Sequence, residues 1–232
     1  MKRSGASLMK ILALEFSSPR RSVAVLDGAK ILAEHVEPAG QGVPPLRLIA
    51  DALAEARVEQ GEIGCVAVGL GPGSYNGIRG AIALAQGWQL SGGAKLLGVS
   101  SVECIAAQAR EEKLLGGVNV VVDAQRNEFY FASYEISSEC LKKLSDLKIV
   151  TLTELQSAII SESLVVGPEV TKWLPNGRVI FPSAATLGRL AASRGDFVSG
   201  AQLEPIYFRS TSFVKAPPPR AGVQTLACLV TH

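Results

Sequence analysis

The residues with the clearest chemical potential are four glycines after an apolar run, Gly69, Gly71, Gly73 and Gly77. Glycine tolerates the positive φ angles of tight turns, and such a turn before a helix can bind a phosphate or receive another backbone segment closely. The string lacks the Gly-Lys-Ser/Thr of a P-loop, and Asn76 stands where a dinucleotide-binding motif has its third glycine. An ordinary strand-to-helix turn, a phosphate loop and a backbone contact therefore all remain open.

Groups that could carry out catalysis are scarce in this chain. Only two histidines occur, His35 at the end of an expected strand and His232 at the terminus, so no paired-histidine metal site can be assembled. A serine nucleophile needs a base within reach, and turn or helix-cap roles account for Ser74, Ser100 and Ser101. We therefore expect no catalytic residue and no metal site, and a peptidase is the least supported function.

The glycines need a strand before them and a helix after them. An apolar run at 65–68 predicts the strand, and an Ala-rich stretch at 78–90 predicts the helix. Upstream, Asp27-Gly28 between two apolar runs is a strong hairpin signal. The chain is therefore expected to open with three antiparallel strands, at 10–15, 22–26 and 30–36.

Two helices, 46–58 and 78–90, have unusually apolar or small-sided surfaces. The first is apolar nearly all round, and one sheet cannot cover such a helix completely. The second repeats small residues at helical spacing, as at Ala83 and Gly87, which lets another helix approach closely. These helices either pack wholly within their own lobe or bind a partner.

The rest of the chain predicts a second, smaller α/β lobe. Ser100 with Glu103, and Thr153 with Gln156, have the spacing of helix capping boxes. The expected elements are a strand at 95–99, a helix from 100 or 101 toward 112, strands at 118–122 and 128–136, an unassigned amphipathic stretch at 141–148, a helix at 153–160, strands at 164–167 and 179–181, and a helix at 183–194 between the lobes. The expected division is 1–103 for the first lobe, 104–209 for the second and 210–232 for a loose, proline-containing tail.

A longer string around the glycines resembles a known family. Gly69-x-Gly-Pro-Gly-Ser-Tyr-x-Gly-x-Arg79 is followed by Leu97-Gly-Val-Ser-Ser-Val-Glu103, and the segments 122–130 and 204–209 extend the match. Together they resemble the TsaB (YeaZ) family over roughly residues 10–209. The resemblance implies two lobes of ribonuclease H-like, actin-like ATPase fold, an α/β class with mixed sheets flanked by helices.

The same resemblance implies a function. TsaB-like proteins are expected to be non-catalytic subunits that dimerise with the catalytic subunit TsaD, work with the ATPase TsaE and contact tRNA only through the complex. That complex transfers threonylcarbamoyl to N6 of adenosine 37 in tRNAs reading ANN codons. A homodimer of the free chain stays open, and the alternative function is a stand-alone actin-like ATPase or small-molecule kinase. The partner interface implied on the two helices comprises Leu46, Ile49, Leu53, Ala56, Arg79, Ala83, Gly87 and Leu90.

Two further sets of residues follow from the resemblance. Asp123, Arg126 and Glu128 match a family motif, and they form either a polar hairpin tip or a contact that holds the lobes or the partner. Arg79 is either a salt-bridge partner or a phosphate contact. The phosphate-loop-like set comprises Glu15, Ser17, Ser18, Gly71, Gly73, Ser74, Tyr75 and Gly77.

Composition and net charge limit the class of protein and the compartment that we expect. Hydrophobic residues make up 47% and charged residues 19% of the 232, which indicates a folded protein. The net charge of +2 is too small to indicate nucleic-acid binding by this chain alone. Four dispersed cysteines indicate buried free thiols in a reducing compartment, and no membrane span or signal peptide is evident. We expect a cytoplasmic protein without a cofactor, with weak ATP or ADP binding left open.

Overall fold

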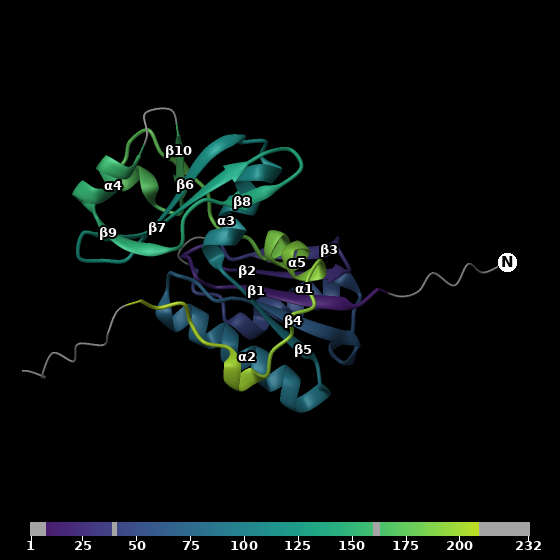
Figure 1. The fold of residues 1–232 in the computed structure, drawn as a ribbon. Coiled ribbons are helices and arrows are strands. Elements are labelled where there is room, and N and C mark those ends of the chain that lie inside the picture. The colour runs from purple at the N-terminus through teal and green to yellow at the C-terminus, as the bar shows by residue number, and fades with distance from the viewer. Residues whose placement is uncertain (1–7, 39–40, 160–162, 209–232) are drawn as a thin grey trace, which may run out of the picture.

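The structure, a computed structural model, describes residues 8–38, 41–159 and 163–208 and has two α/β lobes (Figure 1). The first lobe holds a five-stranded mixed sheet in the order β3-β2-β1-β4-β5. Its strands are β1 (Lys10–Glu15), β2 (Ser22–Asp27), β3 (Lys30–Val36), β4 (Ile63–Gly69) and β5 (Lys95–Val99). The first three pair antiparallel, as predicted, and Gly28 takes a φ of 57° in the hairpin turn. β1, β4 and β5 run parallel, so their carboxyl ends lie at one edge of the sheet.

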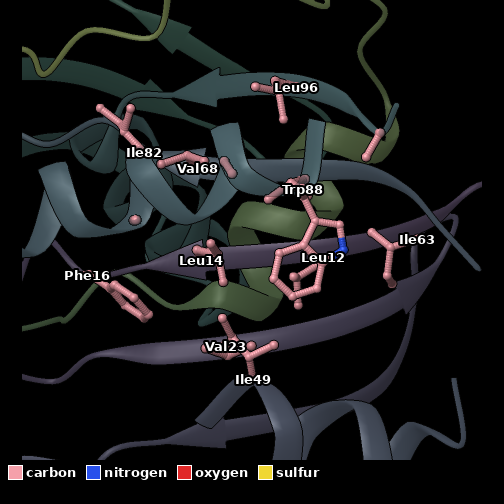
Figure 2. Packing of buried hydrophobic residues seen from close by; sticks show 14 of the residues in the cluster. Leu12, Leu14, Phe16, Val23, Ile49, Ile63, Val68, Ile82, Trp88 and Leu96 are labelled. Carbon is pink, nitrogen blue, oxygen red and sulfur yellow. The ribbon is translucent and has the colours of Figure 1, made fainter. Parts of the chain in front are cut away.

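Helices cover both faces of this sheet. The helices α1 (Pro45–Ala56) and α2 (Tyr75–Gly92) pack on one face, and α5 (Ala184–Ala192) packs on the other. Successive side chains of β1 point to opposite faces of the sheet, so Leu12 and Leu14 face α1 and α2, while Ile11 and Ala13 face α5. Figure 2 shows the first of these cores, where α1 and α2 both contribute side chains around the strands.

The second lobe is built on a six-stranded sheet in the order β11-β10-β6-β7-β8, with β9 also paired to β7. One face packs against α3 and the other against α4. A one-turn 3₁₀ helix, η2, lies beside this sheet, and two others, η1 and η3, lie in the first lobe. The elements are α3 (Ser101–Glu111), β6 (Gly116–Asp123), β7 (Glu128–Ile136), β8 (Leu141–Lys143), β9 (Lys148–Thr151), α4 (Leu152–Ala158), β10 (Leu164–Gly167) and β11 (Arg178–Val179), with η1 at Gln60–Glu62, η2 at Val170–Lys172 and η3 at Gly200–Gln202.

The division of the chain between the lobes differs from the expected one. The boundary at 103/104 falls inside α3, whose buried residues serve the core of the second lobe. α5 lies between the lobes as expected, because it packs on the back of the first sheet and also contacts α3, but it belongs to the core of the first lobe rather than to that of the second. Its small face explains this placement, because a methyl group at Gly188 would lie only 2.2 Å from Leu26. The expected tail, 210–232, lies outside the described residues.

Both predicted capping boxes are wrong. Ser100 precedes α3 but makes no side-chain cap, because its hydroxyl donates to the Gly71 carbonyl, and Glu103 pairs with Arg194 of the segment after α5. The helix expected at 153–160 begins earlier, where Thr151 and Glu154 form the capping box. The unassigned stretch at 141–148 begins as strand β8, and the strand expected at 179–181 is β11, at 178–179.

Cysteine burial follows the prediction in part. Cys65 and Cys104 are buried free thiols, whereas Cys140 is exposed in the turn between β7 and β8 rather than buried. The short Ser137–Cys140 turn explains this, since its thiol lies 3.3 Å from the Ser137 hydroxyl outside either core. Within the described part of the chain, no helix is both long and apolar enough to cross a bilayer.

Candidate functional site

A cleft of about 1180 Å³ lies between the two lobes. Its position follows from topology, because β1 and β4 end on the side where the loop after β6 faces them. Serine and arginine side chains, the glycine loop and three tyrosines line it. The lining includes Ser17, Ser18, Pro19, Arg21, the loop 72–77, Arg79 and Ile105, with Val122, Asp123, Ala124, Gln125, Tyr130, Pro168, Glu169, Pro182 and Tyr207.

The glycine loop packs closely against the backbone of the segment that follows β1. A methyl group at Gly73 would lie 2.1 Å from the carbonyl oxygen of Ser17, and one at Gly77 would lie 2.1 Å from that of Phe16. The N–H of Ser74 donates to the Ser17 carbonyl at 2.7 Å. Of the three readings of the glycines, close approach of another backbone segment is therefore the one that this geometry supports.

Two further N–H groups around the loop, those of Gly71 and Gly77, also have partners. Gly71, at a φ of 84°, donates its N–H to the Ser101 hydroxyl at 3.1 Å. The Ser74 hydroxyl caps α2 by accepting the Gly77 N–H at 3.4 Å. These bonds, with the Ser17 contact, occupy backbone donors that a phosphate would need.

Glu15 does not belong to the cleft, so its prediction as a phosphate-site residue is wrong. Its side chain is fully buried, accepting the Ser17 N–H at 2.8 Å and the Ser101 hydroxyl at 2.9 Å. The carboxylate lies against Gly69, where a methyl group would be 2.1 Å from its Oε2 atom. Burial raises the pKa of Glu15, and these hydrogen bonds partly oppose the shift. Ser17 and Ser18 do line the cleft, although both are at least nine-tenths buried.

Tyr75 and Arg79 form one contact at the start of α2. The Arg79 guanidinium donates to the Tyr75 hydroxyl at 2.9 Å and lies 5.2 Å from its ring centroid. Both residues line the cleft and both are exposed. The partner of Arg79 in this structure is thus the Tyr75 side chain, which its position in the motif did not predict.

The family-motif residues surround the turn between β6 and β7. The Asp123 carboxylate accepts the Gln125 N–H at 2.7 Å and lines the cleft. Gln125, Arg126 and Asn127 all have positive φ, between 57° and 63°, which makes the turn tight. Arg126 is exposed at its tip and Glu128 is half-buried at the start of β7.

The predicted interface residues divide between the surface and the core. Leu46 of α1 is 64% exposed and Leu90 of α2 is 88% exposed, and Ala83 and Gly87 of α2 are exposed as well. Ile49 is 2% exposed, so its assignment to the interface is wrong, since it packs with Val23 in the first-lobe core (Figure 2). Leu53 and Ala56 are half-buried at the edge of that core.

Sequence reasoning missed an ion pair beside the cleft. Arg21 lines the cleft and pairs with Glu37, which is 6% exposed, through two nitrogens. The same guanidinium donates to the Val43 carbonyl at 2.9 Å, and the Val43 N–H donates to Glu37 at 2.8 Å. Arg21 and its hydrogen bonds lower the pKa of Glu37. The pair ties Arg21 to Val43, two residues before α1, and no sequence motif marks it.

Comparisons with known proteins identify the family. A family model described as TsaD, tRNA N6-adenosine threonylcarbamoyltransferase, matches residues 45–200. The tRNA threonylcarbamoyladenosine biosynthesis protein TsaB of Escherichia coli is 26% identical over 221 residues, which cover 87% of this chain and 95% of that protein. The chain belongs to the TsaD family, among its TsaB (YeaZ) members.

Other relatives agree with this assignment. TsaB of Bacillus subtilis is 26% identical over 138 residues, 59% of each chain. The solved structure of YeaZ from Pseudomonas aeruginosa superposes with a TM-score of 0.75 at 23% identity, covering 87% of this chain and all of that one. This likeness confirms the expected α/β fold, with two mixed sheets flanked by helices. The TsaB resemblance read from the glycine string is likewise confirmed.

Proposed function

We propose that this chain is a non-catalytic subunit in the synthesis of threonylcarbamoyladenosine in tRNA. The relatives from E. coli and B. subtilis carry the name of that process. In this proposal the chain dimerises with the catalytic subunit TsaD, which transfers threonylcarbamoyl to N6 of adenosine 37 in tRNAs reading ANN codons. The ATPase TsaE joins the complex. Because the chain's net charge is only +2, tRNA is held mainly by the other subunits.

The observation that supports the proposal is the outward side of α1 and α2, which we call the α1–α2 face. Both helices lie on the same side of the first sheet. Leu46 of α1 and Leu90 of α2 are among the most exposed large apolar side chains in the described structure. Ala83 and Gly87 keep the intervening surface of α2 flat, and a methyl group at Gly87 would meet nothing within 4 Å. Flat, small-sided helices allow close helix–helix packing with a partner.

The side chains available for chemistry support a non-catalytic role. His35, one of two histidines in the chain, binds Glu55 of α1 at 2.7 Å on the surface. The described residues contain no group of three or more His, Cys, Asp or Glu side chains that could hold a metal ion. Ser101, a candidate nucleophile by position, is buried and donates to Glu15. His35 and Ser101 thus each have a structural partner.

Binding to purified TsaD from the same organism tests the proposal. Leu46→Arg and Gly87→Arg place a charge on the α1–α2 face without entering the core, since both positions are open. Each is expected to weaken binding by about tenfold or more, because a charge is then buried without a partner. Leu144→Arg, at a 54% exposed leucine of the second lobe, is the matched control and should bind normally.

The results of this binding experiment distinguish TsaD from a second copy of the chain as the partner of the α1–α2 face. Normal TsaD binding by both variants would show that another surface is used. Self-association of the chain that these substitutions abolish, without any TsaD binding, would assign the face to a second copy. Sedimentation of the chain alone and with TsaD distinguishes these results.

The interlobe cleft favours a second candidate function, a stand-alone actin-like ATPase or kinase that binds ATP or ADP. Its volume of about 1180 Å³ is ample for a nucleotide. We rank this candidate second because the amides of Gly71 and Ser74 already have partners and Glu15 faces away from the cleft. Calorimetric titration with Mg-ATP tests it, and turnover by the isolated chain would favour it over the subunit role.

A further inference from the structure

The last residues that the structure describes, 203–208, form a segment that we call the C-terminal strap. The first residues of the strap pack against the first lobe. Leu203 is 5% exposed within the first-lobe core, and the Ile206 N–H donates to the Leu70 carbonyl at 2.8 Å. Just before it, Gly200 bonds the side chains of Gln86 and Gln89 on α2. The strap therefore moves with the first lobe.

The far end of the strap reaches the second lobe. The Tyr207 ring lies 5.6 Å from that of Tyr75, the first residue of α2, and the Phe208 ring lies 6.1 Å from that of Tyr130 in β7. Tyr75, Tyr130 and Tyr207 all line the interlobe cleft. In Figure 1 the strap is the yellow segment that leaves η3 and runs beside α2. The Tyr207–Tyr75 pair thus holds the strap on α2 of the first lobe, and the Phe208–Tyr130 pair connects the strap to the second lobe at the cleft.

A separate contact joins the lobes where the chain passes between them. α3, which follows β5 into the second lobe, packs against α5 of the first lobe. The Glu111 carboxylate of α3 forms an ion pair with the Arg189 guanidinium at 2.7 Å and accepts a hydrogen bond from the Thr186 hydroxyl at 3.1 Å. Arg194 pairs with Glu103 on the same helix. This contact can serve as a hinge, and the strap is a second connection whose making or breaking changes the angle between the lobes.

We propose that the C-terminal strap sets the width of the interlobe cleft. While both ring pairs are made, the second lobe is held toward α2. When Phe208 leaves Tyr130, the lobe can turn about the α3–α5 contact and the cleft widens. This control of cleft width is separate from partner binding on the α1–α2 face.

The strap contacts are weak enough to open. Tyr75, Tyr207 and Phe208 are 45%, 46% and 53% exposed, so release uncovers little further apolar surface. An aromatic pair of this kind favours the arrangement that makes it by a factor of roughly 2 to 10. Because only the Phe208–Tyr130 pair spans the two lobes, its loss should raise the open population by that factor.

Distance measurements between two spin labels test the inference on the isolated full chain. The exposed Cys140 of the second lobe provides one site, and Ser91→Cys, exposed near the end of α2, provides the other. Cys65 and Cys104 are buried and stay unlabelled, and Cys228→Ser removes the remaining thiol. In this background the variants are Phe208→Ala, Tyr207→Ala with Phe208→Ala, and Phe208→Tyr, which keeps the ring. Leu115→Ala, at a 58% exposed leucine outside the strap, is the matched control.

The parent and the Phe208→Tyr chain are expected to give one dominant distance. Phe208→Ala and the double variant should both add a second population at another distance, because both lose the pair that spans the lobes, and Leu115→Ala should leave the distribution unchanged. An unchanged distribution in the double variant, with normal circular dichroism, overturns the inference. This result would not bear on TsaD binding, which uses other residues and another assay.

Discussion

Replacing Gly77 by alanine is expected to destabilise the protein, although alanine is the better helix former. The new methyl group would lie 2.1 Å from the Phe16 carbonyl oxygen. Unbonded carbon and oxygen atoms rarely approach closer than about 3.3 Å, so the turn after β1 must retreat by about 1 Å. Such overpacking costs about 1–3 kcal/mol, and losing the 2.7 Å bond from Ser74 to Ser17 costs about 1 kcal/mol more. A helix-propensity gain of about 1 kcal/mol offsets part of this.

The net loss expected for Gly77→Ala is therefore about 1–3 kcal/mol, or about 3–10 °C in Tm for a chain of this size. Gly80→Ala, in the same helix, is the matched control, because a methyl group there meets nothing within 4 Å. It should stabilise the protein by about 0.5–1 kcal/mol. Urea unfolding followed by fluorescence measures both, with Trp88 reporting the first lobe and Trp173 the second. If Gly77→Ala proves as stable as Gly80→Ala, the close backbone contact does not exist in solution.

Three further predictions concern ionisable groups and thiols. Burial raises the pKa of Glu15, so its contribution to stability declines as pH rises from the ordinary value of 4.5 through the folded pKa. Glu15→Gln should raise the free energy of unfolding near neutral pH and flatten that decline. Glu37 has a lowered pKa, so its contribution is present above 4.5 and is lost as pH falls. Arg21→Ala should cost about 2–3 kcal/mol near neutral pH and remove most of this acid dependence, and a cost unchanged by Glu37→Gln would contradict the pairing. In a chain without the tail cysteine, Cys140 should react rapidly with a thiol reagent, whereas Cys65, whose pKa burial raises to about 11, should react only on unfolding.

Local signals in the sequence predicted local structure well. Asp27-Gly28 gave the hairpin because the turn requires a residue that accepts positive φ. The glycine string predicted the strand, loop and helix around it, and left a backbone contact among its roles. Only the fold could reveal which backbone approaches, since Phe16 and Ser17 are distant in sequence.

Features that depend on distant partners could not be predicted. Leu46 and Ile49 are both apolar residues of α1, and the sheet decides that only Ile49 is buried. Glu15 is a carboxylate that the family resemblance places near the loop, but its burial depends on Ser101 and Gly69. The position of α5 depends on small residues more than a hundred positions away in the strands.

The path of α5 has a consequence for synthesis on the ribosome. The back of the first sheet, with Ile11 and Leu26, is covered by a helix that ends only at Ala192. At typical elongation speeds, roughly 5–20 s separate the emergence of β5 from that of α5. During this interval the second lobe can already fold, while one apolar face of the first sheet stays exposed to solvent. We expect nascent chains arrested before α5 to recruit chaperones more strongly than chains that include it.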